Sequence, residues 1–141
     1  MTDSINGFSG DWAFLSNLYL SPVEWNSFLF PSVENAFQAA KTSDAEAWKR
    51  LTALPPDQAA TFGQTVPLRP DWEEIKLTVM AELLAAKFEI PALRRRLIAT
   101  ARRDLINQNW WGDRFWGRVK DQGENHLGRL LMELRQRLLA E

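Results

Sequence analysis

The chain has 141 residues and a formal net charge of −1, with no cysteine and one histidine, His126. This length fits one domain, spanning residues 1–141, and a charge near zero argues against a protein that holds nucleic acid mainly by bulk electrostatics. Without cysteine there is no disulfide or thiolate nucleophile, and one histidine argues against a catalytic triad or a multi-histidine metal site. Acid–base chemistry would therefore fall mainly on carboxylates, lysine or tyrosine.

The ends and the apolar runs of the chain indicate a cytoplasmic protein. The N-terminus lacks the basic and apolar regions of a signal peptide, and no apolar run is long enough to span a bilayer. We therefore expect no membrane association. Seven tryptophans and eight phenylalanines are many for this length, and we expect some of them to form a core and others a stacking surface.

The first elements predicted are an extended piece and a hairpin. Leu15–Leu20 is compatible with a short extended piece, in which Ser16 and Asn17 favour a turn. Val23–Trp25 and Phe28–Phe30 are aromatic or β-branched and flank a turn-forming Asn-Ser pair, so they predict a β-hairpin.

A helix capped by Ser32 and running to Lys41 comes next, and its side chains form two adjacent stripes. The apolar stripe contains Val33, Ala36, Phe37 and Ala40. The polar stripe of Glu34, Gln38 and Lys41 borders it, where the wall of a pocket would lie. The alternative is that these three side chains form an ordinary solvated face.

Ser43 and Glu46 have capping-box spacing and predict a short helix through Leu54. Asp57–Phe62 predicts one or two more helical turns, closed by Gly63. We assign no chemistry to this connecting segment.

The longest helix is predicted to start at Asp71 and to stop before Pro91. Arg69 precedes it, and a guanidinium beside free helix N–H groups suits a phosphate. The alternative for Arg69 is an ion pair with Asp71 or Glu73. Trp72, in the first turn, belongs either to the core or to the wall of the same site.

Pro91 opens another helix, whose arginines form a basic surface. Residues 109–117 then form an irregular loop rich in tryptophan and glycine. Asp113 in this loop has two interpretations: a carboxylate with a perturbed pKa, suited to acid–base work, or the cap of a turn that accepts from backbone N–H groups. A final helix follows, for which we expect His126 to be structural. The order of elements predicts an α+β, predominantly helical domain with one small β-hairpin and four to five main helices.

Several stretches resemble one family in order and spacing over nearly the whole chain. They are Phe14-Leu15-Ser16-Asn17, Pro31-Ser32-Val33-Glu34, Phe37-Gln38-Ala39-Ala40-Lys41, Leu68-Arg69 with Asp71-Trp72, Lys87-Phe88, Trp111-Gly112-Asp113 with Phe115-Trp116-Gly117, and Gly123-Glu124-Asn125-His126-Leu127-Gly128. The chain thereby resembles the NADAR family, also called YbiA-like, in its compact bacterial or phage-type form.

The resemblance implies an N-glycosidase. Family members hydrolyse the C–N bond of ribosylamine phosphate intermediates of riboflavin biosynthesis, or remove ADP-ribose from guanine, including guanine in nucleic acid. The family motifs fall on Glu34, Gln38 and Lys41, on Arg69, Asp71 and Trp72, and on Trp111, Gly112 and Asp113. Two residues depart from the pattern: Asn35 replaces the usual histidine, and Asn107 replaces a glutamate found in many members.

These residues support a mechanism in which Glu34, Lys41 and Asp113 are catalytic. Glu34 would activate water or stabilise an oxocarbenium-like state, with Asp113 as the second carboxylate. Alternatively, Lys41, with its pKa lowered by desolvation, would form a Schiff base with the ring-opened sugar. The candidate substrate-binding residues are Ser16, Asn17, Gln38, Arg69, Trp72, Trp111, Gly112 and Asn125.

The scheme requires no cofactor and no metal. The competing hypothesis is a non-catalytic module that binds ADP-ribose or another nucleotide. Such a module would keep Arg69 and the tryptophans, but it would have no use for Lys41 beside Glu34.

Overall fold

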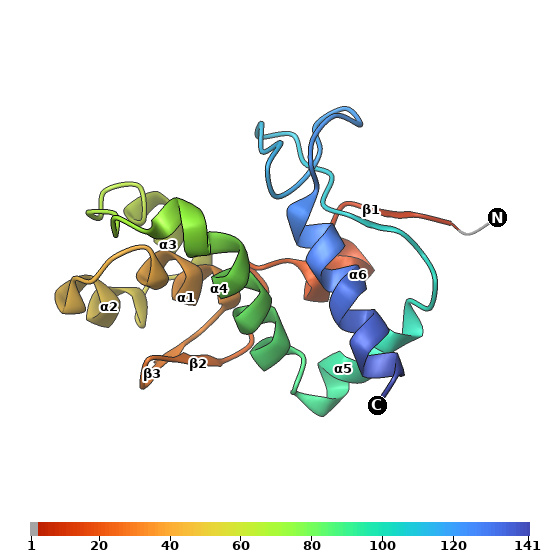
Figure 1. The fold of residues 1–141 in the computed structure, drawn as a ribbon, viewed down its shortest axis with the longest axis horizontal. Helices are drawn as coiled ribbons and strands as arrows, with labels where there is room; N and C mark the ends of the chain where they lie inside the picture. Colours follow the sequence, from red (N-terminus) through yellow and green to blue (C-terminus); the bar gives the residue numbers. More distant parts are fainter. Residues whose placement is uncertain (1–2) are drawn as a thin grey trace. The chain divides into compact units, whose positions relative to one another are not determined.

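The computed structural model describes residues 3–141, which form six α-helices, one 3-10 helix and four short strands (Figure 1). The predicted α+β, mainly helical class is confirmed. The chain divides into a central unit, Asn17–Lys87, and a terminal unit made of Met1–Ser16 and Phe88–Glu141. The single domain expected over residues 1–141 stays a prediction.

The central unit contains the predicted hairpin. Strand β2 (Val23–Trp25) pairs antiparallel with β3 (Phe28–Phe30), and Val23 lies opposite Phe30. The turn residues Asn26 and Ser27 have φ values of 51° and 68°. Positive φ at both positions is the turn geometry that matches the twist of the flanking strands.

Helix α1 (Val33–Ala40) is the element around which the central unit is built. It packs against α2, α3, α4 and both strands of the hairpin, and every residue of the helix except Glu34 is buried. The predicted cap is confirmed, because the Ser32 hydroxyl accepts a 3.1 Å hydrogen bond from the backbone N–H of Asn35. The apolar stripe of the sequence thus lies in the core.

Two short helices follow, α2 (Ala45–Leu51) and α3 (Pro56–Phe62). The predicted capping box at Ser43 is wrong: the carboxylate of Asp44 accepts from the backbone N–H of Glu46 at 3.0 Å. The Thr42 hydroxyl accepts from the N–H of Asp44 and so holds it at the helix start. Helix α2 also ends at Leu51, earlier than predicted, whereas α3 ends at Phe62 with Gly63 as its C-cap, as expected.

Helix α4 (Trp72–Lys87) completes the central unit, and it buries an apolar face made of Val79, Met80, Leu83 and Leu84. Its first residue, Trp72, is 5% exposed, and its ring centroid lies 5.0 Å from that of Phe37 on α1. The predicted long helix is confirmed, although it ends at Lys87.

The terminal unit joins the two ends of the chain. Strand β1 (Ile5–Asn6) pairs parallel with β4 (Leu105–Ile106), a pairing that the sequence pattern did not predict. Helix α5 (Pro91–Ala99) packs on α6 (His126–Leu139), and α6 also packs on β4. The extended piece predicted from Leu15 is wrong, because Leu15 ends a 3-10 helix (Gly10–Leu15) and a turn follows.

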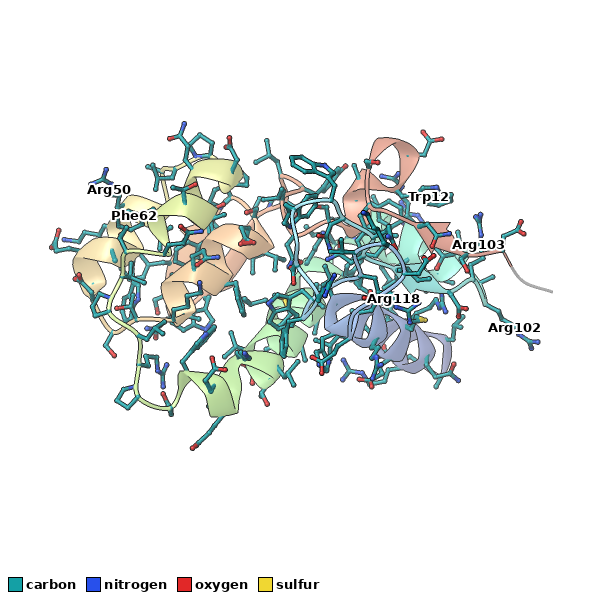
Figure 2. The ribbon with its side chains drawn as sticks, turned by 90° about the horizontal axis from the view of Figure 1, so that it is seen from above. Trp12, Arg50, Phe62, Arg102, Arg103 and Arg118 are labelled. Carbon is teal, nitrogen blue, oxygen red and sulfur yellow. The ribbon has the colours of Figure 1, made fainter. Side chains whose placement is uncertain are left out.

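Part of the predicted basic surface lies on aromatic rings of the terminal unit. The Arg103 guanidinium lies 4.9 Å from the centre of the Trp12 ring (Figure 2). The guanidinium of Arg96 lies 4.1 Å from the centre of the Phe14 ring. These arginines therefore cover apolar surface in addition to carrying charge. Within residues 3–141, no helix combines the length and the apolar character that crossing a bilayer requires.

Candidate active site

Glu34 and Gln38 are joined on the polar stripe of α1. The Gln38 Nε2 donates a 2.8 Å hydrogen bond to Glu34 Oε1, and Gln38 is only 5% exposed. The backbone N–H of Glu34 donates at 3.0 Å to the carbonyl of Asn17. Glu34 lies in the first turn of α1, where the positive end of the helix dipole interacts favourably with a negative charge. The pair matches the predicted stripe, one turn apart on the same face.

Lys41, at the C-terminal end of α1, is half-buried and its pKa is lowered from 10.5. Burial is the largest cause; the negative charge of Glu34 acts in the opposite direction, and the positive charge of Lys76 lowers the pKa further. The lowering that we predicted from desolvation is confirmed. A lowered pKa increases the fraction of neutral amine, which is the nucleophilic form.

Lys76 is a residue of this region that sequence reasoning missed. It lies one helical turn after Trp72, on the face of α4 whose Trp72 ring meets Phe37 of α1, and its ammonium pairs with Glu73 at 2.9 Å. The four-residue spacing from Trp72 was a usable signal, because residues four apart share a helix face.

Arg69 is attached to the end of α1 through the backbone. Its N–H donates a 2.7 Å hydrogen bond to the carbonyl of Lys41, and its Nε and Nη2 bind the two carboxylate oxygens of Asp71 at 3.1 and 3.2 Å. The ion-pair alternative is therefore the geometry seen here. The Arg69 side chain keeps 33% of its surface exposed, so part of it remains open to solvent. Trp72, in contrast, is core.

Asn17 and Ser16 lie next to each other where the chain approaches the start of α1. The Asn17 Nδ2 contacts the Met80 sulfur at 3.6 Å, while its Oδ1 is buried and accepts no hydrogen bond within residues 3–141. The backbone N–H of Ser16 donates to the carbonyl of Ala13. The unpartnered side-chain oxygen of Asn17 suits a ligand hydroxyl donor, and the backbone carbonyl of Asn17 accepts from the N–H of Glu34.

The Asp113 carboxylate in the terminal unit serves the turn that it begins. Its Oδ1 accepts from the backbone N–H groups of Phe115 and Trp116 at 3.1 and 2.9 Å. The Asn109 side chain binds both the N–H and the carbonyl of Asp113. The turn-cap alternative is thus present in the structure, and a catalytic role for Asp113 stays a prediction.

The tip of the same loop is open to solvent. Trp111 is 58% exposed and Trp110 is 87% exposed, with their ring centroids 5.7 Å apart. Gly112 has a φ of 91°, a conformation that favours glycine. The stacking role expected of Trp111 stays a prediction.

Asn125 is buried and holds the backbone of β4. Its Oδ1 accepts from the N–H of Asn107, and its Nδ2 donates to the carbonyl of Leu105. Its predicted role as a hydroxyl binder stays a prediction. The His126 ring lies 3.1 Å from a carboxylate oxygen of Glu124.

The structure assigns a place to Asn35, the first departure from the family pattern. The buried Asn35 side chain donates to the carbonyls of Leu51 and Leu54, both at 2.8 Å, and it contacts the Ser32 hydroxyl. It therefore fixes α1 to the C-terminal end of α2 and points away from the polar stripe. Local periodicity carries no signal for this contact.

The predicted residues fall into two groups. The central unit contains Asn17, Glu34, Gln38, Lys41, Arg69 and Trp72. The terminal unit contains Ser16, Trp111, Gly112, Asp113 and Asn125. Within the central unit, α1 and the segment from Arg69 into α4 bring most of their group together.

A hollow of about 290 Å³ lies elsewhere in the central unit. It is lined by Asp44, Glu46, Ala47, Arg50, Phe62, Thr65, Val66 and Pro67, and the Arg50 guanidinium lies 5.0 Å from the centre of the Phe62 ring (Figure 2). None of the candidate residues lines this hollow. Among residues 3–141, no three His, Asp or Glu side chains gather as metal ligands would.

Comparison with known proteins gives concordant results. The family model described as NADAR domain matches residues 4–139. N-glycosidase YbiA of Escherichia coli is 38% identical over 152 aligned residues, covering 100% of this chain and 92% of that protein. Riboflavin biosynthesis protein PYRR of Arabidopsis thaliana, a chloroplastic protein, is 36% identical over 132 residues, covering 88% of this chain and 21% of that protein.

A solved structure extends the likeness to the fold. The NMR structure of E. coli YbiA matches with a TM-score of 0.87 and 37% identity, covering 99% of this chain and 88% of that chain. Sequence and fold therefore agree over nearly the full length.

Proposed function

Because this chain belongs to the NADAR family, we propose that it hydrolyses the C–N bond between a ribose and a base or amine in a ribosyl phosphate or ADP-ribosyl compound. Its activity as a hydrolase of N-glycosyl bonds rests on the family and on similarity over the full chain to a protein named N-glycosidase. The riboflavin relative supports a ribosylamine phosphate as substrate. ADP-ribosylated guanine, free or in nucleic acid, is the second candidate.

We propose that the Glu34 carboxylate acts at the anomeric carbon of the ribose. As the bond to nitrogen breaks, positive charge develops on the sugar, and a carboxylate stabilises that charge or activates the attacking water. The hydrogen bond from Gln38 orients the Glu34 carboxylate, and its position in the first turn of α1 suits a negative charge. Asp113 is the proposed second carboxylate, which would supply the proton for the leaving nitrogen.

Lys41 offers a covalent route. Its neutral amine attacks C1 of a ring-opened ribosylamine; the bond from C1 to the lysine nitrogen forms, and the bond to the leaving nitrogen breaks as that nitrogen takes a proton. Water then adds to the iminium carbon, the C1–lysine bond breaks, and the free sugar and neutral amine result. The lowered pKa of Lys41 supports this route.

The remaining candidates would bind the substrate. Arg69, oriented by Asp71, would hold the phosphate, since guanidinium groups bind phosphate oxygens in pairs. Trp111 would stack on the base, a contact worth about 1–3 kcal/mol in nucleic-acid systems. Asn17 and Asn125 would bind ribose hydroxyls. A cytoplasmic location stays a prediction from the sequence.

The observation that carries this proposal is the Glu34–Gln38 hydrogen bond on the same stripe as an amine of lowered pKa. The test is a panel of ribosylamine phosphates, ADP-ribosylated guanosine and ADP-ribosylated guanine in an oligonucleotide, assayed for released base or amine. Wild type should release product from at least one compound, and Glu34→Ala should lose orders of magnitude in turnover while remaining folded. Wild-type protein that binds ADP-ribose without releasing base from any of them would be a binding module.

A borohydride arm separates the two chemical routes. Reduction during turnover should trap a sugar on Lys41 if the covalent route operates. A Lys41→Ala variant with full activity would leave direct hydrolysis by Glu34 and reject the Schiff base.

A further inference from the structure

Gly63 meets the Gln38 side chain where α3 packs on α1. A Cβ atom built on Gly63 would overlap Gln38 Oε1 and would lie 2.5 Å from Cδ and 2.9 Å from Cγ. A side chain at position 63 can therefore be accommodated only if the Gln38 amide moves, because that amide occupies the space that the Cβ would fill. Gly63 itself is buried, at the C-terminal cap of α3.

The backbone of Gly63 does not explain the glycine. Its φ and ψ are −61° and −18°, an ordinary right-handed helical conformation that alanine adopts without strain. Alanine also has a higher helix propensity than glycine and reduces the entropy of the unfolded chain. The absent side chain is therefore required for space, and the group that uses that space is the amide of Gln38.

The orientation of this amide is chemically selected. Its Nε2 donates to Glu34 Oε1, while its Oε1 faces Gly63 and accepts no hydrogen bond within the described chain. In the reverse orientation an amide oxygen would face a carboxylate, two acceptors in contact. A buried carbonyl oxygen without a partner is unusual and calls for an explanation. Here the amide gives up that hydrogen bond while directing its donor at Glu34.

We infer that Gly63 is a positioning residue of this N-glycosidase, because it leaves the room in which Gln38 is held against the Glu34 carboxylate. The inference rests on the proposed role of Glu34. Gly63 touches no substrate; it acts through Gln38, and Gln38 acts through Glu34.

The activity test is a double-mutant cycle on a substrate that the panel identifies. Gly63→Ala should lower kcat by about 10- to 100-fold, as expected for a misplaced catalytic group, with a small change in KM. Gln38→Ala should cause a similar loss. The double variant should be no slower than Gln38→Ala alone, because the alanine at 63 then has room. Gln64→Ala, an exposed neighbour, is the matched control and should behave as wild type.

The outcomes separate a positioning role from a merely structural one. Unchanged kcat in Gly63→Ala, or equal losses from that change with and without Gln38, would overturn the inference. If Gly63→Ala fails to fold, the double variant should recover a cooperative thermal transition. A double variant that also stays unfolded would show that position 63 acts through another contact, and it would likewise overturn the inference.

A second readout needs no substrate and so separates this inference from the proposed function. In wild type, the side-chain amide signals of Gln38 in a ¹⁵N–¹H spectrum should shift as the Glu34 carboxyl titrates, and Glu34→Gln should abolish that shift. Gly63→Ala should abolish it too. If the Gln38 amide signals follow the Glu34 titration but the protein has no glycosidase activity, only the proposed function is rejected. If the protein is active but these signals do not follow the titration, only the role of Gly63 is rejected.

Discussion

The backbone N–H of Arg69 donates a 2.7 Å hydrogen bond to the carbonyl of Lys41. This hydrogen bond joins residues that lie far apart in the sequence. It holds the backbone of Arg69, the proposed phosphate-binding residue, next to that of Lys41, the proposed nucleophile. The Arg69 guanidinium is oriented separately, by both oxygens of Asp71. The two proposed roles thus fall on neighbouring backbone positions, which favours a substrate that carries a phosphate as well as the ribosyl C–N bond.

Arg69 should select for that phosphate. We expect Arg69→Ala to raise KM for a ribosylamine phosphate by about 10- to 100-fold with a smaller effect on kcat, because a uniformly bound group is lost. KM for the unphosphorylated ribosylamine should change little. Arg69→Lys should not restore binding, since lysine cannot reproduce the paired contacts of the guanidinium. An equal effect on both substrates would place the phosphate elsewhere.

Lys76 should control the pH dependence of Lys41. The neutral amine is required for attack, so kcat/KM should rise with pH through the lowered pKa of Lys41. Lys76→Gln removes a positive charge that lowers this pKa, so the rise should move to higher pH. Lys76→Arg keeps the charge and should leave the profile in place. Coincident profiles for wild type and Lys76→Gln would refute this electrostatic role.

Asn35 should contribute to stability rather than to turnover. Asn35→Ala leaves the carbonyls of Leu51 and Leu54 without their donor, which should cost about 2–4 kcal/mol in the free energy of unfolding. Urea denaturation measures this loss. At a temperature where the variant remains folded, its kcat should match that of wild type, because the side chain points away from Glu34. A large loss of kcat in folded Asn35→Ala would contradict this assignment.

Lys87 should make the stability of the protein depend on pH. This lysine is fully buried, and burial lowers its pKa from 10.5 to about 7. Between these two values the unfolded chain binds the proton and the folded chain does not, so stability should rise as pH increases above about 7. Below that range both states are protonated, and the full penalty of the buried charge remains.

Lys87→Met tests this pH dependence. The variant keeps an apolar chain of similar length, so the urea midpoint should rise at acid pH and lose most of its slope between about pH 7 and 9. A slope equal to that of wild type would assign the dependence to other groups.

Asp113 allows its two interpretations to be separated by one conservative change. Asp113→Asn keeps an oxygen that can accept from Phe115 and Trp116, so the turn should persist and the melting temperature should change little. If the carboxylate takes part in the chemistry, kcat should nevertheless fall by about 10²- to 10⁴-fold. Asp113→Ala should lower the melting temperature as well. Full activity in Asp113→Asn would restrict this residue to the turn.

Much of the local structure of the central unit could be predicted from the sequence. The cap at Ser32, the apolar stripe of α1 and the adjacent polar stripe follow from residue type and helical period, and the Glu34–Gln38 contact joins residues one turn apart. Local reasoning failed where neighbours competed, as when Asp44 and not Ser43 capped α2. A carboxylate one residue closer to the helix took the role of the hydroxyl.

Residue type and helical spacing therefore determined a helix whose polar stripe carries an acid, an amide and an amine. Only the tertiary structure decided what contacts those side chains and their helix: Gly63 lies against Gln38, and the backbone N–H of Arg69 donates to the carbonyl of Lys41. On the other side of the helix, it turned Asn35 toward α2. The parallel pairing of Ile5 with Leu105 belongs to the same class. Such contacts depend on how distant segments fold back on one another. The period of any one segment specifies which face is buried, but not which atoms bury it.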